Sequence, residues 1–552
     1  MSKRYRIQQV KLGINESKDE IPKKILKKLG RRDYIISDYE IVRESIDARD
    51  KNDIKFVYTV DFELMSAQNH KQQVTLPVNG KKGISPAPEM VYLDVPSGAQ
   101  PLKHRPVIVG FGPCGMFAGL ILARRGYRPV ILERGNRVEQ RVEDVQRFWN
   151  EGILDTESNV QFGEGGAGTF SDGKLTTGIK DPRIRKVLSE LVKAGADPDI
   201  MYKQKPHIGT DVLVTVVKNI RKEIIACGGE VKFGARFEEL ILKDGEVAGV
   251  RYSQAAGSQR IMHELEADSV IMAMGHSARD TFRALNGQGV GMKQKPFSIG
   301  VRIEHPQEMI DRAQYGNVRG LPPADYKLSY HCENGRGVYT FCMCPGGEVV
   351  IASSQEGLVV TNGMSNRARN SGTANSALLV DVRCEDFGSD SPLAGVDFQE
   401  KYERLAFENG GGNYRAPKCT WGEFRKLDSE TGSETALNDA VEDAARASSQ
   451  AARSVAASLP DFAVESIKEA MPHMGRRIRG FDSDEAVMTA TETRSSSPVR
   501  FDREMETMEG SFAGLYPAGE GAGYAGGIMS AACDGIKAAE KIIARFYVEK
   551  YN

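Results

Sequence analysis

The stretch RPVIVGFGPCGMFAGLILARR, residues 105–125, decides the fold of this chain. Its uncharged middle is almost as long as the ~20 apolar residues that a membrane-spanning helix needs. Its glycines indicate another structure, because Gly110, Gly112 and Gly115 follow the β-branched run 107–109 in G-x-G-x-x-G spacing. The first glycine allows a tight turn, the second lets a phosphate approach the backbone, and the third lets a helix pack closely on the strand. We therefore predict a strand, a turn and a helix rather than a membrane segment.

The residues around this turn fit a dinucleotide site. The helix is expected to run from about Pro113 to Arg125, and its first amides, beginning at Cys114, would point at phosphate. A second strand, YRPVILE, ends at Glu133, and Arg134 follows it. An acidic residue about 20 positions after the first glycine is the one expected to bind ribose hydroxyls. The stretch is therefore predicted to bind a dinucleotide.

The composition narrows the class of protein. The chain has 552 residues, enough for about three to four domains, with 40% hydrophobic residues and a net charge of -1. This near-neutral charge gives no argument for binding to nucleic acid or to a membrane surface. The stretch MSKRYRIQQVKLGINESKDE lacks the apolar core of a signal peptide, and the eight cysteines are scattered rather than spaced as a disulfide framework. We expect a cytoplasmic protein without membrane attachment or bound metal, and leave open whether it forms a homo-oligomer.

Pattern and composition divide the chain into five segments. Residues 1–78 are predicted to form a small ferredoxin-like α+β module, since strands and one helix follow in β-α-β-β order. Residues 79–104, rich in Pro, Gly, Ser and Ala, are predicted to be a linker. Residues 105–295 and 480–552 are predicted to form one nucleotide-binding domain, with 296–479 as an inserted α+β cap or substrate domain. The expected fold class is α/β, with a Rossmann-like domain at its centre.

The short helix expected at IPKKILKKLG carries several basic residues. They allow two interpretations, a patch that binds RNA or a partner, and the solvated face of an amphipathic helix. We prefer the second, which is the commoner origin of such a run of charges. The basic residues are Lys23, Lys24, Lys27, Lys28, Arg31 and Arg32.

Three further segments extend the nucleotide site. GEGGAGTFSDGK, residues 163–174, supplies amides and hydroxyls that could cradle a second phosphate or a flat ring, although it could also be a flexible surface loop. DSVIMAMGHS, residues 268–277, is typical of a buried parallel strand that ends at Gly275. GLYPAGEGAGYAGGI, residues 514–528, places Glu520 in a glycine turn before another helix. One extended ligand at the carboxyl edge of the sheet could touch all of these segments.

These motifs resemble known flavoproteins. The order G-x-G-x-x-G, E-R-G, A-x-G and a late G-E-G is similar to that of glutathione-reductase-type Rossmann flavoproteins, and the late G-E form resembles the fumarate-reductase and aspartate-oxidase branch. More narrowly, QFGEGGAGTFSDGKL, YTFCMCPGGEVV, ETRSSSPVR and GLYPAGEGAGYAGG resemble the bacterial family of uncharacterised FAD-dependent dehydrogenases, over nearly the whole chain. The resemblance implies extended FAD, with Glu133 on the ribose and Glu520 on the ribityl chain. Met274 departs from it, because many of these flavoproteins have Thr there.

The residues predicted to contact FAD come from all of the glycine segments and from the region of Phe237. They are Gly110, Gly112, Pro113, Cys114, Gly115, Glu133, Arg134, Gly166, Gly168, Thr169, Ser171, Gly173, Lys174, Phe237, Ala273, Gly275, Gly519, Glu520, Gly526, Gly527 and Ile528.

Five residues are candidates for the reacting groups. Cys342 and Cys344 could relay electrons as a dithiol or contact the flavin as a thiolate. We prefer to interpret them as small core residues on one face of a strand. Arg494 and Arg500 flank three serines and could hold a substrate carboxylate or phosphate, or make ordinary ion pairs. His276, just beyond a strand end, could donate a proton or have a structural role.

The chain is therefore predicted to be an FAD-dependent oxidoreductase that passes hydride between flavin N5 and a small organic substrate. The flavin itself performs this chemistry. The sequence shows no second strand-glycine-helix unit for NAD(P)H, so NAD(P)H would act as a transient donor, or a protein would supply the electrons. Two alternatives stay open. One is a flavin-dependent RNA-modifying enzyme that uses the basic N-terminal module, and the other is a flavin-bearing redox sensor or partner protein without catalytic activity.

Overall fold

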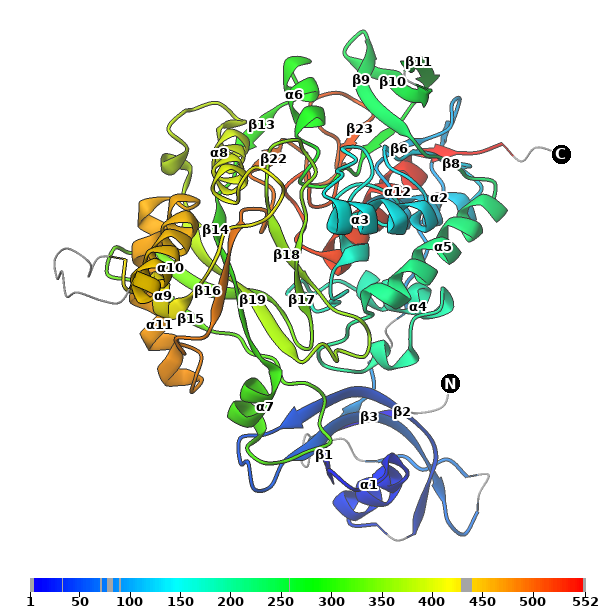
Figure 1. Ribbon diagram of the computed structural model, residues 1–552. Helices are drawn as coiled ribbons and strands as arrows, with labels where there is room; N and C mark the ends of the chain where they lie inside the picture. Colours follow the sequence, from blue (N-terminus) through cyan, green and yellow to red (C-terminus); the bar gives the residue numbers. More distant parts are fainter. Residues whose placement is uncertain are drawn as a thin grey trace.

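The computed structural model of the chain describes residues 4–31, 33–69, 72–76, 83–88, 91–257, 259–427 and 439–549. Figure 1 shows three parts: an N-terminal unit in blue, a central parallel sheet with its helices, and an antiparallel sheet with helices on its left. The prediction of a mixed α/β chain is confirmed. The glutathione-reductase type is a finer assignment that this topology does not decide, and it stays a prediction.

The N-terminal unit is a four-stranded antiparallel sheet with one helix against it. Helix α1 buries Ile21, Ile25 and Leu29, the spacing of a single apolar stripe. The strand order is β2-β3-β1-β4, so the sheet takes its last strand from the predicted linker. The described residues include no second α-helix between β3 and β4, and the ferredoxin-like assignment stays a prediction. The elements are β1 (Tyr5–Gly13), η1 (Lys18–Glu20), α1 (Ile21–Leu29), β2 (Tyr34–Asp47), β3 (Lys55–Ser66) and β4 (Ile84–Pro86).

Helix α1 is amphipathic, as preferred from the sequence. Lys23 pairs with Glu20 at 2.7 Å and Lys24 with Glu16 at 2.6 Å. Lys28 donates to a main-chain carbonyl of β1 at 2.6 Å. These lysines therefore have partners within their own unit.

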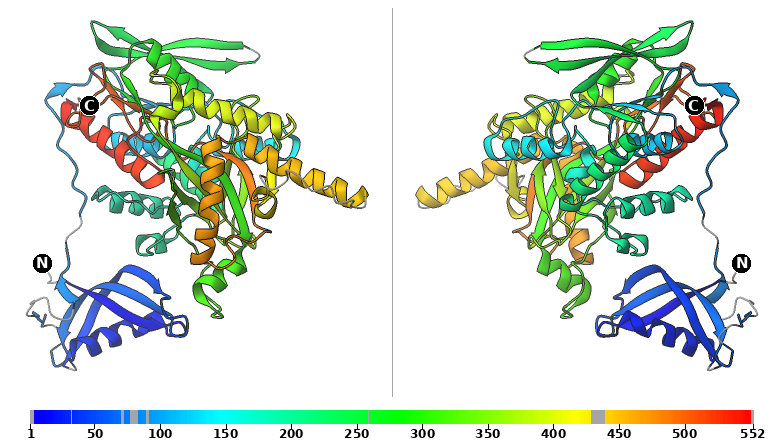
Figure 2. Two further views of the ribbon diagram at one scale, coloured as in Figure 1. Left: turned by 90° about the vertical axis from the view of Figure 1, so that its left-hand side faces the viewer. Right: turned by 90° about the vertical axis from the view of Figure 1, so that its right-hand side faces the viewer.

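The N-terminal unit joins the rest of the molecule through β2. The amide of Glu44 donates to the carbonyl of Tyr202 at 2.8 Å, and its carbonyl accepts from Gln204 at 2.9 Å. Figure 2 shows the unit at one end of the molecule, with residues 91–104 extending from it to the central sheet. There two short strands pair in parallel, β5 (Gln100–Pro101) and β24 (Phe546–Tyr547).

Five parallel strands form the central sheet in the order β23-β12-β6-β7-β8. Helix α2 approaches both the sheet and α12 closely, because glycines stand at the two contacts, Gly115 on α2 and Gly535 on α12. A Cβ at Gly115 would lie 2.0 Å from the carbonyl oxygen of Gly110, and one at Gly535 only 2.1 Å from that of Cys114. The elements are β6 (Val107–Val109), α2 (Pro113–Arg124), β7 (Val130–Leu132), α5 (Thr210–Ala226), β8 (Glu230–Lys232), β12 (Val270–Met272), β23 (Leu515–Pro517) and α12 (Ile528–Arg545).

The uncharged run within residues 105–125 is thus a core helix and not a membrane segment. It has ten consecutive buried positions, from Cys114 to Ala123. Nowhere in the described ranges is a helix long and apolar enough to cross a membrane. Further elements surround the central sheet, including the antiparallel sheet β9-β10-β11 at the top of Figure 1. They are α3 (Val138–Glu151), η3 (Ala167–Phe170), α4 (Arg183–Lys193), η4 (Pro198–Met201), β9 (Ala235–Lys243), β10 (Glu246–Ala256), β11 (Gln259–Glu266), α6 (Arg279–Gly287), β13 (Met292–Gln294) and β22 (Val499–Phe501).

The inserted cap is built on a six-stranded antiparallel sheet in the order β15-β16-β19-β14-β21-β20. Helices α10 and α11 share one hydrophobic core with it, in which Val301, Leu378, Val455 and Met471 are fully buried. Strand β21 pairs with β14 and β20, so the cap sheet extends past the predicted boundary at 479. The elements are β14 (Phe297–Pro306), α7 (Gln307–Tyr315), β15 (Ser329–His331), β16 (Gly337–Cys344), β17 (Glu348–Ile351), β18 (Thr361–Met364), β19 (Thr373–Val382), η5 (Cys384–Phe387), α8 (Ala394–Asn409), β20 (Lys418–Thr420), α9 (Trp421–Phe424), α10 (Asp439–Ala457), α11 (Asp461–Arg477) and β21 (Val487–Glu492).

Candidate functional site

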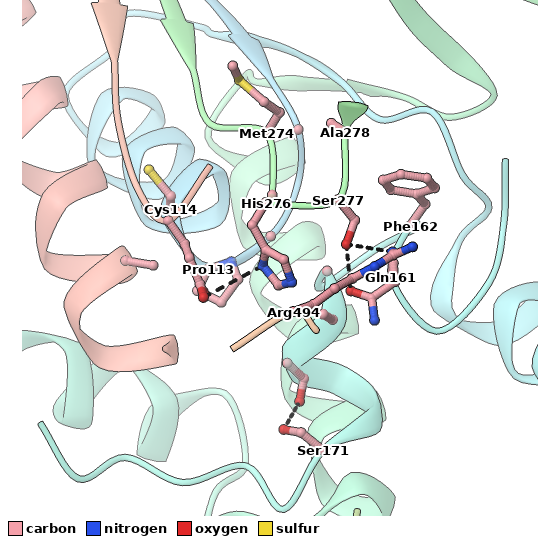
Figure 3. A pocket seen from close by; sticks show the side chains of 18 of the residues that line it. Pro113, Cys114, Gln161, Phe162, Ser171, Met274, His276, Ser277, Ala278 and Arg494 are labelled. Carbon is pink, nitrogen blue, oxygen red and sulfur yellow. Dashed lines mark hydrogen bonds and ion pairs between the residues drawn. The ribbon is translucent and has the colours of Figure 1, made fainter. Parts of the chain in front are cut away.

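A large pocket lies between the carboxyl edge of the central sheet and the cap (Figure 3). The space between its atoms is about 1700 Å³, a volume that includes open solvent at its mouth. Its walls come from the ends of β6, β7 and β12, from the glycine loop 163–174, and from β16, β18 and β21 of the cap. Strand β6 lies between β7 and β12, and this reversal of strand order is where open α/β sheets bind ligands.

The structure brings most residues of the predicted cofactor site to this pocket. Three of them lie behind its wall instead: Gly115 packs on the first turn, Thr169 donates its hydroxyl to Glu164 O at 3.4 Å, and the amide of Gly519 donates to Asp534 at 2.8 Å. The others line it: Gly110, Gly112, Pro113, Cys114, Glu133, Arg134, Gly166, Gly168, Ser171, Gly173, Lys174, Phe237, Ala273, Gly275, Glu520, Gly526, Gly527 and Ile528.

Two glycines face each other across the start of α2. A Cβ at Gly166 would lie 3.0 Å from the Cα of Gly112, and one at Gly112 would lie 3.7 Å from the Cα of Gly166. Helix α2 begins directly after Gly112, which has no side chain to cap its first amides. Bare backbone beside a helix N-terminus is typical of sites that bind a pyrophosphate.

Glu133 ties three loops of the pocket together. One carboxylate oxygen accepts from the amide of Phe111 at 2.8 Å. The other accepts from the amides of Gly135 and Gly163, both at 3.0 Å. The side chain is 5% exposed and lines the pocket. Glu133 therefore fixes the first glycine turn against the glycine loop, in addition to the predicted ribose contact.

The glycine loop is held from behind by Arg141, which the sequence analysis missed. Its guanidinium is fully buried and donates to five main-chain carbonyls, among them Gly163 O, Glu164 O at 2.7 Å and Gly166 O at 2.9 Å. The same guanidinium lies over the ring of Phe170. The loop is thus a fixed wall of the pocket and not a flexible surface loop.

Glu520 and His276 face each other in the pocket. Nδ1 of His276 lies 3.6 Å from a carboxylate oxygen of Glu520, and the amide of Gly527 donates to the other oxygen at 3.3 Å. Burial raises the pKa of Glu520 to about 7. Burial, with the charges of Arg494 and Arg279, lowers the pKa of His276 to about 3. Of the two, Glu520 is the group that can exchange a proton near neutral pH, whereas His276 was the donor considered from the sequence.

Of the two candidate arginines, Arg494 is engaged by a buried carboxylate and Arg500 lies outside the pocket. Arg494 makes two hydrogen bonds to Glu403, at 3.0 and 2.7 Å, and donates to Ser277 at 3.0 Å. Figure 3 shows Ser277 next to Arg494 and Gln161. Arg500 is exposed, lies outside the pocket lining, and stacks on Tyr524 at 4.5 Å. The contacts of Arg494 are the ordinary ion pairing that the sequence analysis had left open as the alternative.

The two candidate cysteines do not lie on one face of a strand. Strand β16 loses its register with β19 between Phe341 and Cys344, and Cys342 there has a φ of 42°. Cys342 lines the pocket, whereas Cys344 is fully buried behind it. The preferred interpretation as paired core residues is therefore wrong for Cys342.

The cap supplies charged residues that the sequence analysis did not single out. Glu492 lines the pocket and pairs with the fully buried Arg302 at 2.9 Å. Burial raises the pKa of Glu492 to about 7 despite this pair. From the cap, Arg369 also donates to Asp172 of the glycine loop, which is buried in the lining, at 2.6 and 3.0 Å. Glu492 was inside the quoted motif ETRSSSPVR, but its pairing with residues far away in the sequence gave no local signal. Within the described ranges no group of three His, Cys, Asp or Glu side chains could hold a metal ion.

Comparison with known proteins links the chain to flavoproteins. Residues 296–495 match a family model described as FAD-dependent protein, C-terminal domain-like, and residues 4–63 match a domain of unknown function. An uncharacterized protein of Clostridium beijerinckii is 46% identical over 549 residues, which is 99% of both chains. A digeranylgeranylglycerophospholipid reductase of Haloferax volcanii is 30% identical over 235 residues, 41% of this chain and 50% of that protein.

Solved structures resemble this chain more distantly. A geranylgeranyl bacteriochlorophyll reductase-like protein of Thermoplasma acidophilum has 12% identity and a TM-score of 0.34, and the match covers 79% of this chain and 78% of that one. A flavoprotein/dehydrogenase of Cytophaga hutchinsonii has 13% identity and a TM-score of 0.34, with coverage of 79% and 76%. Similarity this low does not bear on the reaction.

Proposed function

Since this chain belongs to the family of FAD-dependent proteins, we propose that it is an oxidoreductase that transfers hydride between bound FAD and a small organic substrate. The observation that carries the proposal is the bare backbone at Gly112 and Gly166, beside the start of α2 and at the edge of a large pocket. The positive φ of Gly166 itself favours glycine, whereas neither the φ of -77° at Gly112 nor the 3.7 Å to its nearest neighbour requires one, so a close approach by phosphate would explain the bare backbone at Gly112.

The positions of the pocket residues are consistent with one orientation of FAD. The pyrophosphate would lie between Gly112 and Gly166, on the N-terminus of α2. Glu133 and Arg134 line the side next to β7, where the ribose of the adenosine would bind. Glu520 and Gly527 lie on the other side and would hold the ribityl chain. When bound, FAD supplies two-electron chemistry, and the chain supplies binding, orientation and protons.

Two carboxyl groups are suited to move a proton in this pocket. Glu520 and Glu492 both line it, and burial raises the pKa of each to about 7. A group whose pKa lies near the working pH is the most effective general acid or base. The lowered pKa of His276 keeps it neutral at that pH, with Nδ1 3.6 Å from Glu520.

The similarity to the Haloferax reductase covers 41% of the chain. It supports electron transfer from the reduced flavin to the substrate rather than the reverse direction. We propose NAD(P)H as a transient donor or a protein as the electron source. The RNA-modifying alternative gains no support, because the basic residues of α1 described above have acidic or main-chain partners in their own unit.

An absorbance spectrum of the purified protein tests the proposal. The spectrum is recorded without oxygen while NADH and then NADPH are added. We expect a flavin band that one of the two bleaches within seconds. A flavin band that neither bleaches would favour a protein donor or a sensor. A spectrum without flavin, even after incubation with FAD, would overturn the proposal.

A further inference from the structure

Cys342 is in an unusual position for a non-glycine residue. It stands where β16 loses its register with β19, with a φ of 42°, a left-handed conformation that costs a residue with a Cβ on the order of 1–2 kcal/mol. This bend turns Cys342 into the pocket, while Cys344 remains buried two residues further on. Of the seven non-glycine residues with positive φ in the described part of the chain, Cys342 is the one that lines the pocket, and strain of this kind clusters at functional sites. The bend therefore points to a role for the Cys342 sulfur in the pocket.

Two cations lie against this pair of cysteines. Nζ of Lys174 lies 4.0 Å from Sγ of Cys342 and also donates to the carbonyl of Met343. Nη2 of Arg302 lies 3.5 Å from Sγ of Cys344 and donates to the carbonyl of Cys342 at 2.7 Å. Positive charge next to a sulfur stabilises the thiolate, and the effect is strong where water is excluded.

The two thiols shift each other's pKa in opposite directions, and the Cys344 thiol donates to the carbonyl of Cys342 at 3.3 Å. A hydrogen bond from Cys344, with the charges of Lys174 and Arg302, holds the pKa of Cys342 well below its usual range. The same hydrogen bond and burial raise the pKa of Cys344 well above it. Cys342, which lines the pocket, is therefore the more easily deprotonated of the two thiols, and Cys344, which is fully buried, is the one that keeps its proton.

The other buried cysteines differ from this pair. Burial raises the pKa of Cys332 and Cys419, as it does that of Cys114, which also lines the pocket. Buried thiols of this kind are inert. The lowered pKa of Cys342 and the two neighbouring cations distinguish Cys342 and Cys344 from them.

We propose that Cys342 and Cys344 are a redox-active dithiol that exchanges two electrons with FAD. The inference rests on the proposed function, because FAD is the partner that takes or supplies the electrons. In the oxidising direction an Sγ–Sγ bond forms, and the electron pair and the single proton of Cys344 pass to the flavin. Thiolate, thiol and FAD thereby become disulfide and FADH⁻, and the reverse step balances in the same way. The pair would let the pocket store a second pair of electrons between donor and substrate.

An anaerobic reductive titration of the FAD-bound protein with dithionite tests this inference. We expect the oxidised protein to take up about four electrons per chain, since the flavin and the disulfide each take two. Cys342→Ser and Cys344→Ser should each reduce the uptake to about two. Cys384→Ser is the matched control, because Cys384 is also half-buried in the cap but does not line the pocket. It should leave the uptake at about four.

Alkylation followed by mass spectrometry gives a second readout that needs no enzyme activity. Cys342 should be protected in the oxidised protein and modified after the flavin is reduced. In the reduced protein its modification should be rapid at neutral pH, and Lys174→Met should move this reactivity to higher pH, because a positive charge is removed. Uptake of about two electrons, with Cys342 equally modified in both states, would overturn the inference and leave the proposed function intact. Failure to bind FAD at all would overturn both.

Discussion

At the scale of single residues, Gly112 and Gly166 leave the backbone bare where the proposed phosphate would lie. A Cβ at Gly112 would meet nothing closer than 3.7 Å, and the backbone there is compatible with any residue. Gly112→Ala should therefore leave the melting temperature unchanged and weaken FAD binding at least about tenfold, about 1.4 kcal/mol. Titration of FAD-free protein with FAD measures this, with the exposed Gly178→Ala as control. Equal affinity in both variants would show that no phosphate lies there.

Glu520 gives a second prediction at this scale. Its pKa is about 7 in the fold, against 4.5 for an ordinary glutamate, so the folded state binds the proton more tightly than the unfolded chain. The resulting stabilisation is complete below pH 4.5 and is lost as the pH rises to about 7. Its full size is on the order of 3 kcal/mol. Urea unfolding of FAD-free protein should show a smaller loss of stability between pH 5 and 8 in Glu520→Gln than in the parent or in the exposed Glu506→Gln. An identical pH dependence in all three would contradict the prediction.

At the scale of elements, helix α3 and the glycine loop depend on one side chain. Arg141 of α3 satisfies five main-chain carbonyls of residues 159–166 from a fully buried position. Arg141→Met would leave these acceptors unpaired, and each unsatisfied buried group costs roughly 1–3 kcal/mol. We expect a loss of at least about 3 kcal/mol in the free energy of unfolding, together with proteolysis within the loop.

The matched control for this element is Arg147→Met, since Arg147 is on the same helix and its side chain is 47% exposed. That variant should change the free energy of unfolding by less than about 0.5 kcal/mol. Equal stability of the two variants, or a loop that stays resistant to protease in Arg141→Met, would show that the loop is fixed by its own backbone contacts.

At the scale of the whole molecule, the sequence predicts local elements such as strands and turns. It does not predict the contacts between segments that are far apart in the chain. The strand-turn-helix at Gly110 and the strand before Gly275 follow from glycine spacing and short apolar runs, and both lie at the pocket. The place of β21 in the cap sheet depends on pairing with strands that are far away in the sequence. The left-handed backbone conformation at Cys342 could not be predicted, because the residue at that position is not a glycine. Such features need the tertiary structure, because no spacing rule connects their partners.

Glu403 joins the cap to the central domain and gives the last prediction. It is fully buried on α8 and accepts from Arg279 of α6 at 2.7 and 2.9 Å, and from Arg494 at 2.7 and 3.0 Å. Although burial opposes it, these two guanidinium groups hold the pKa of Glu403 well below its usual range. Removing this charge leaves two buried guanidinium groups without the carboxylate that they share, a loss of about 3–5 kcal/mol.

Glu403→Gln should therefore lower the free energy of unfolding by that amount and loosen the cap from the central sheet, so that FAD dissociates faster. Chemical unfolding and the rate of FAD release measure the two effects. Glu408→Gln, at an exposed position of the same helix, should change neither. A destabilised Glu403→Gln that still releases FAD at the parental rate would mean that the ion pairs stabilise the cap itself and do not close the pocket.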